Sequence, residues 1–160
     1  MKELNTLKIE KIINDFLEPF ECKCELSDGF TFDDATNIIT YALFYAQDGT
    51  DKDFLDAIEK HHKPQVTADL FLWSLLHEIG HHETLCQFSD KDFEEYLTFS
   101  TDAFEGKHTN YEYCTCPIEW TATEWAVEYA NNNFEEISIF WNELQSALME
   151  FYRKYKLIDA

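Results

Sequence analysis

The sequence predicts an α+β fold: a mostly helical single domain over residues 1–160, with a small antiparallel or mixed sheet packed on one central helix. Two observations predict it. Hydrophobic residues make up 45 % of the 160 residues, while only four are glycine and three are proline, which is typical of compact helical proteins. Helical periodicity covers most of the chain, and only the stretch from residue 20 to residue 45 has the β-branched and aromatic content of strands.

The first third of the chain contains the predicted sheet. Residues 5–18 space their apolar side chains at near-helical intervals before Pro19, which predicts a packing helix. The segments ECKCEL and NIITYALFY then predict two short strands around the turn-like sequence SDGFTFDD. The segment KDFLDAIEKHHKP predicts a short helix that ends at Pro64.

The rest of the chain is predicted to be helical, with one irregular stretch. The helix over residues 70–83, LFLWSLLHEIGHHE, is apolar almost all round and is expected to be buried, with Thr67 or Asp69 starting it. A helix around DKDFEEYLTF and an irregular segment, GKHTNYEYCTCP, follow. Pro117 opens the helix IEWTATEWAVEYANNN, and the amphipathic helix FEEISIFWNELQSALMEFYRKYK closes the chain.

The charge of the chain disfavours some partners and favours others. Thirty-two acidic against twelve basic residues give a net charge of −20, which repels nucleic-acid phosphates and anionic membranes. We therefore expect no direct nucleic-acid binding and no membrane association, whereas basic proteins are favoured partners. A merely solvated surface and a surface that imitates nucleic acid both fit the same charge. The charged N-terminus and the lack of a spanning apolar stretch predict a cytoplasmic protein with reduced thiols.

The motif H-E-x-x-H lies at the end of the buried helix. His77 and His81 are four residues apart, so they point the same way from a helix and can bind one Zn²⁺ ion. Catalytic zinc takes three protein ligands and leaves a position for water. Glu78 lies beside the histidines and can act as the catalytic base that takes the proton of that water.

The third ligand is predicted to come from the helix that Pro117 opens. Of its glutamates, Glu124 and Glu128 lie about 140° and about 180° around the helix from Glu119. The face that Glu119 shares carries small side chains, namely Ala122, Thr123, Ala126 and Ala130. A helix packed closely by this face presents only Glu119 to the metal, and Gly80 eases the approach from the other side.

The segment LLHEIGHH, followed by Glu119, Ala122, Trp125 and Ala126 in the pattern E-x-x-A-x-x-W-A, resembles the compact zinc peptidases of the ImmA/IrrE type within the gluzincin group. The resemblance implies Zn²⁺ bound by His77, His81 and Glu119, and Glu78 as the base. It also implies cleavage of a protein substrate, a basic DNA-binding repressor or regulator, in a phage or another mobile element.

The chain departs from this family in three respects. Residues 82–118 form a longer connection between the motifs than is usual, and we expect no attached helix-turn-helix domain. Thr123 stands where gluzincins tend to carry an acidic residue that holds a ligand histidine. No motif marks a donor for the transition state, so Tyr111, Tyr113 and His108 are all candidates.

Other interpretations of the same residues stay open. The motifs can form a structural core cluster or a zinc site without catalysis, and the chain can be an acidic, metal-stabilised binding or inhibitor protein, either a nucleic-acid mimic or a mobile-element counter-defence factor. The pairs Cys22/Cys24 and Cys114/Cys116 suit either a second metal site or unligated thiols. Cys86 is expected in the core or at its boundary. The remaining polar side chains of the histidine-rich segments are expected to face solvent: His61, His62, His82 and Glu83.

Overall fold

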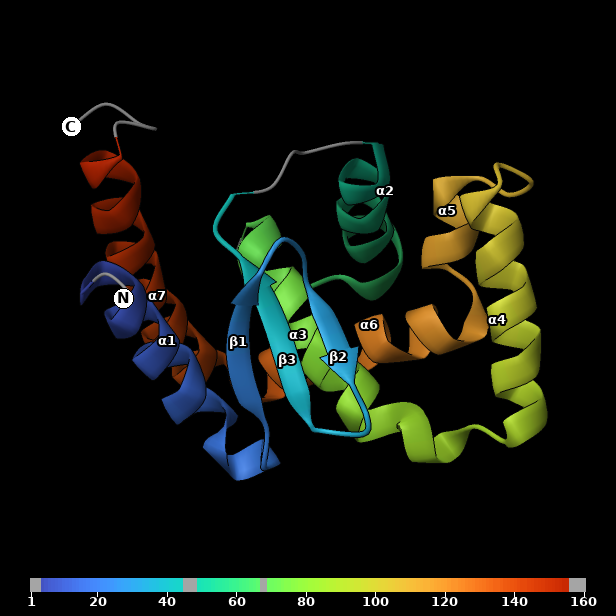
Figure 1. Ribbon diagram of the computed structural model, residues 1–160, viewed down its shortest axis with the longest axis horizontal. Helices are drawn as coiled ribbons and strands as arrows, with labels where there is room; N and C mark the ends of the chain where they lie inside the picture. Colours follow the sequence, from blue (N-terminus) through green and yellow to red (C-terminus); the bar gives the residue numbers. More distant parts are fainter. Residues whose placement is uncertain (1–3, 45–48, 67–68, 156–160) are drawn as a thin grey trace.

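The computed structural model describes residues 4–44, 49–66 and 69–155 (Figure 1). Three strands follow the first helix; these elements are α1 (Leu4–Leu17), the 3-10 turn η1 (Glu18–Phe20), β1 (Lys23–Ser27), β2 (Thr31–Asp33) and β3 (Ile38–Ala42). The remaining elements are helical: α2 (Gly49–Ala57), η2 (Ile58–His62), α3 (Leu70–Thr84), η3 (Leu85–Gln87), α4 (Asp90–Phe104), α5 (Asn110–Cys114), α6 (Pro117–Asn132) and α7 (Phe134–Lys154). The mostly helical α+β class is confirmed.

The sheet is mixed, in the order β1-β3-β2. β1 runs parallel to β3, and β2 pairs antiparallel with β3. The two predicted strands are confirmed as β1 and β3. The segment between them, SDGFTFDD, was predicted to be a turn, and this part was wrong because it contains a third strand, β2. Phe32 pairs with Ile39 there, and the hydroxyls of Thr31 and Thr40 on the paired strands are 2.7 Å apart. Among the described strands β2 has one neighbour, so it is an edge of the sheet.

α3 is the central helix, and the sheet packs on it as predicted (Figure 1). Its N-cap is Asp69, whose carboxylate accepts hydrogen bonds from the backbone N–H of Phe71 and of Leu72. Most of its side chains are buried, and the ring of Phe71 contacts Phe30 beside β2 and Tyr41 on β3. The apolar run therefore forms the centre of the core, and the polar end of α3 emerges from it.

α6 packs along α3 through its face of small side chains, on which Ala122, Ala126 and Ala130 are buried. The two helices touch at Gly80: a Cβ at this position would lie 2.3 Å from the carbonyl oxygen of Ala122. Only a glycine fits such a contact. On the opposite side, α1 and α7 pair and close the core (Figure 1).

α4 and α5 form the side of the molecule away from α1 and α7 (Figure 1). α4 begins with a capping box in which Ser89 and Asp92 each bind the other's backbone N–H, yet none of its residues is buried. α5 lies in the segment that was predicted to be irregular. That prediction was wrong, because a second capping box, Thr109 with Glu112, starts a short helix there.

In the part of the chain that the structure describes, no helix combines the length and the apolar character needed to cross a bilayer.

Candidate metal centre

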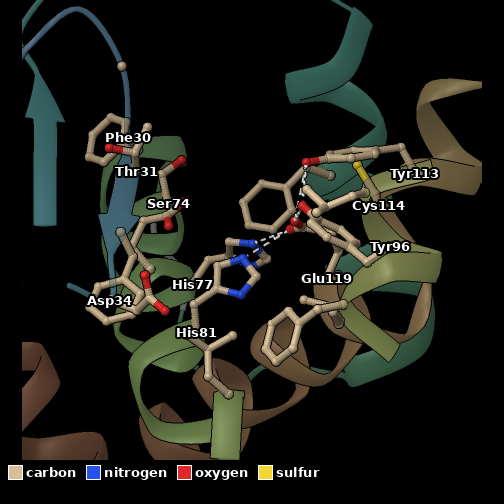
Figure 2. A pocket seen from close by; sticks show the side chains of 18 of the residues that line it. Phe30, Thr31, Asp34, Ser74, His77, His81, Tyr96, Tyr113, Cys114 and Glu119 are labelled. Carbon is tan, nitrogen blue, oxygen red and sulfur yellow. Dashed lines mark hydrogen bonds and ion pairs between the residues drawn. The ribbon is translucent and has the colours of Figure 1, made fainter. Parts of the chain in front are cut away.

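Three predicted ligand side chains converge where α3 crosses α6. Oε2 of Glu119 lies 2.7 Å from Nε2 of His77 and 3.2 Å from Nε2 of His81 (Figure 2). The side chains are only 9 % to 12 % exposed. Of all the His, Cys, Asp and Glu side chains in the described ranges, only these form a group whose ligand atoms could hold a metal ion, all within 4.8 Å of one another. Two imidazole nitrogens and one carboxylate oxygen are a donor set that zinc accepts.

The second nitrogen of His77 is also bound. The hydroxyl of Thr123 donates to the backbone carbonyl of Glu119 and lies 2.9 Å from Nδ1 of His77. Because the hydroxyl proton is used, Nδ1 must supply the proton of this contact, which assigns the tautomer of the ring. Nε2 of His77 then faces a carboxylate oxygen at 2.7 Å, and this contact requires either a second proton or a cation. Thr123 thus holds His77, the predicted ligand, at the position where the resembled family uses an acidic residue.

The ionisation of this group reflects the same contacts. Burial lowers the pKa of His77, but the hydrogen bond and the charge of Glu119 outweigh burial and raise the pKa. Burial raises the pKa of Glu119, but hydrogen bonds from His77 and His81 outweigh it, so the pKa lies well below its ordinary value. Glu119 is therefore an anion, and a proton or a cation held by the histidines balances its charge.

The other oxygen of Glu119 binds two tyrosines. The hydroxyl of Tyr96 on α4 donates to Oε1 at 2.6 Å, and that of Tyr113 on α5 lies 3.2 Å from the same atom (Figure 2). The two hydroxyls are also 3.0 Å apart. Burial, followed by the charge of Glu119, raises the pKa of both phenols, so both stay protonated donors at neutral pH.

Glu78 lies next to the group but makes no ligand contact with it. Its side chain lines the same cavity as His77 and His81. Burial raises the pKa of Glu78 to about 7, partly offset by the two histidines. A carboxyl group with a pKa near neutrality exchanges protons readily at physiological pH, as a general base requires.

The group forms the floor of a cavity of about 840 Å³. One wall comes from β2 and its flanks, including Phe30, Thr31 and Asp34, and the opposite wall comes from α4 and α5, including Tyr96 and Tyr113 (Figure 2). The described residues that line the cavity include no lysine and no arginine. The cavity gives access to the candidate metal centre.

The structure separates the other site candidates. Glu124 is exposed and does not join the metal-binding group, and Glu128 is likewise exposed. Tyr113 lines the cavity, whereas Tyr111 contacts His61 and His108 stacks on Phe99, outside it. Sequence reasoning missed Tyr96, because no local pattern brings α4 to Glu119.

The cysteines stay outside the metal group, and no second group is found among the described residues. No disulfide joins any of the five, and the thiols of Cys22 and Cys24 lie 3.5 Å from backbone carbonyl oxygens. Cys86 was expected in the core or at its boundary but is exposed, because the turn η3 leads the chain away from the core.

The expectation that four polar side chains face solvent was right for His61 alone. Glu83 is partly buried, and so is His82, whose ring packs against Phe32. His62 is also partly buried, because its ring packs against Trp120.

Comparison with known proteins adds no family. No family model, no curated protein and no solved structure matches the chain. The similarity to ImmA/IrrE peptidases is therefore carried by the two motifs alone, and the structure adds a buried His-His-Glu group that could bind a metal ion.

Proposed function

We propose that the protein is a zinc-dependent metallopeptidase that hydrolyses a peptide bond in a protein substrate in the cytoplasm. One observation carries the proposal: His77, His81 and Glu119 meet at the floor of an accessible cavity, with Glu78 beside them. A purely structural cluster needs neither a cavity nor an adjacent carboxyl group whose pKa is raised to about 7.

The donor set supports zinc as the metal. Catalytic zinc sites use three protein ligands drawn from histidine and carboxylate, and a fourth position stays free. Zinc bound there would supply a Lewis acid that lowers the pKa of water and polarises a peptide carbonyl. Thr123 fixes the ring of His77, and hydrogen bonds of this kind to ligand histidines raise metal affinity.

The residues of the chain supply the proton transfers. Glu78 takes a proton from the attacking water and passes it to the leaving amine, and its pKa of about 7 suits both steps. Tyr113 is the donor that we propose for the negative charge of the transition state. Its proton has two acceptors, Oε1 of Glu119 at 3.2 Å and the oxygen of Tyr96 at 3.0 Å, and a substrate oxygen in the cavity would replace them. Tyr96 would keep its 2.6 Å hydrogen bond to Oε1 while Tyr113 turns to the substrate.

A basic DNA-binding regulator is the proposed substrate. The resemblance to ImmA/IrrE peptidases suggests it, and the net charge of −20 attracts basic proteins. The same charge favours a second function, in which the protein binds and inhibits a nucleic-acid-handling partner without cleaving it and the metal only stabilises the fold.

Glu78→Gln tests this choice. Gln keeps the size of the side chain but accepts no proton, so the variant should retain fold and zinc while hydrolysis falls by a factor of ~100 to ~10,000. Wild type and variant are produced at matched abundance in bacterial cells, and new protein N-termini are counted by mass spectrometry. Zinc content is measured on both purified proteins.

New termini that appear with wild type and vanish with Glu78→Gln support the peptidase. If both proteins change the cells equally and neither creates termini, the peptidase proposal is wrong and the binding protein replaces it. His77→Ala cannot serve here, because it removes zinc under both functions.

A further inference from the structure

Tyr96 and Tyr113 form hydrogen bonds with Oε1 of Glu119, the oxygen of this carboxylate that could serve as a further metal ligand. A carboxylate binds a metal through one oxygen or through both, and Ca²⁺ sites often use both. Here Oε2 of Glu119 faces the two histidines, while Oε1 accepts the tyrosine hydroxyls at 2.6 Å and 3.2 Å. Tyr96 comes from α4 and Tyr113 from α5, so both belong to elements other than the crossing helices α3 and α6.

We propose that Tyr96 and Tyr113 are positioning residues that hold Oε1 of Glu119, limit this carboxylate to one metal–oxygen bond, and thereby select zinc over metals that prefer many oxygen ligands. Three donors and an open position suit zinc, whereas Mn²⁺, Mg²⁺ and Ca²⁺ prefer six or more oxygen-rich positions. The inference needs the metal site but does not need peptidase activity.

The hydrogen bonds to Oε1 are strengthened by the negative charge of Glu119. Hydrogen bonds to an ionised carboxylate are shorter and about twice as strong as neutral ones, and the 2.6 Å bond from Tyr96 belongs to this class. Rotating Glu119 so that both oxygens face a metal would break this bond and take the carboxylate acceptor away from two partly buried hydroxyls, which could then form only the weaker neutral hydrogen bond to each other. The tyrosines thus oppose two-oxygen coordination.

The exposure of α4 allows a role of Tyr96 in the metal centre to be distinguished from a role in core packing. No residue of α4 is buried, so little of the core depends on Tyr96. Removing the hydroxyl should therefore change the metal centre far more than the stability of the fold. If Tyr96 served folding alone, removing its hydroxyl would change the stability of the fold more than the metal centre.

The test measures metal affinity in three variants: Tyr96→Phe, Tyr113→Phe and, as the matched control, Tyr111→Phe. Tyr111 lies on the same short helix as Tyr113, but its hydroxyl contacts His61 and not Glu119. Zinc and Mn²⁺ affinities are measured by competition with a chromogenic chelator. Loss of a residue that supports a ligand typically weakens metal binding ~10-fold to ~100-fold.

We expect Tyr96→Phe and Tyr113→Phe to lose zinc affinity by about this factor and Mn²⁺ affinity by less, so that the zinc preference falls. Tyr111→Phe should keep both affinities. Co²⁺ in place of zinc gives an independent readout, because its visible absorption weakens when a fifth ligand joins four. The absorption should drop in Tyr96→Phe and Tyr113→Phe only.

Equal losses of zinc and Mn²⁺, or an unchanged Co²⁺ spectrum, would refute the selection of zinc by the tyrosines while the metal site itself stands. A wild-type protein that binds no metal refutes the metal site, this inference and the peptidase together. If the tyrosine variants show the expected metal affinities while Glu78→Gln acts like wild type in cells, that result would refute the peptidase alone.

Discussion

Gly80→Ala tests the helix crossing on which the site depends. The added Cβ would lie 2.3 Å from the carbonyl oxygen of Ala122 and 2.9 Å from its carbonyl carbon. Real contacts of this kind are not shorter than 3.0 Å, so α3 and α6 must separate by at least 0.7 Å, the difference between 3.0 and 2.3 Å. The obstructing atoms are backbone, so no side-chain rotation relieves the contact.

The energetic cost has two opposing parts. Overpacking a tight core costs about 1–3 kcal/mol, and a clash with backbone belongs at the upper end. Replacing glycine by alanine inside a helix returns about 1 kcal/mol. We therefore expect Gly80→Ala to lower the free energy of unfolding by about 2 kcal/mol. Zinc affinity should fall as well, because metal–ligand distances tolerate shifts of only about 0.2 Å.

The assay is urea unfolding in the presence of chelator, followed by zinc titration of the folded variant. Gly29→Ala is the matched control, because a Cβ there meets nothing within 4 Å, and its stability should stay within about 0.5 kcal/mol of wild type. If Gly80→Ala unfolds at the wild-type urea concentration and binds zinc equally well, the close crossing is wrong, and so is the argument that it selects Glu119.

Three further predictions address the ligands and their protons. Glu119→Ala should abolish zinc binding, whereas Glu124→Ala, on the exposed face, should bind zinc like wild type in the same titration. Thr123→Val should weaken zinc binding ~10-fold or more without removing it, because His77 loses the partner of Nδ1; unchanged affinity would contradict the role of Thr123. Burial raises the pKa of Glu78 from 4.5 to about 7, so the folded metal-free protein binds this proton more tightly than the unfolded chain. Its stability should therefore fall as pH rises through that interval, and urea unfolding at several pH values should show a flatter profile for Glu78→Gln.

The residues of the candidate metal-binding group could be predicted from sequence because local signals place them. Asp69 starts α3 and Pro117 starts α6, and the helical register then places His77, His81 and Glu119. The small side chains of α6 predicted which of its faces would meet α3. Local chemistry was sufficient here, since each helix carries its own start signal and its own contact face.

Elements that depend on distant partners could not be predicted in this way. β2 is only three residues long and exists because Thr31 and Phe32 pair with β3, so its sequence alone looks like a turn. Tyr96 reaches Glu119 because α4 returns to the site after leaving it, and no spacing in the sequence encodes that return. The exposure of Cys86 likewise depends on where the chain turns after α3.

The segment between the two motifs starts and ends at the proposed ligands. It leaves α3 just after His81, returns to α6 just before Glu119, and touches Glu119 in between through Tyr96 and Tyr113. The carboxylate of Glu119 therefore contacts His81, which precedes this segment, and also Tyr96 and Tyr113 within it. The tip around Gly106 lies outside these contacts, with open space beside it. This tip is not among the residues that line the cavity, so sequence changes there should leave the floor of the cavity and its chemistry the same.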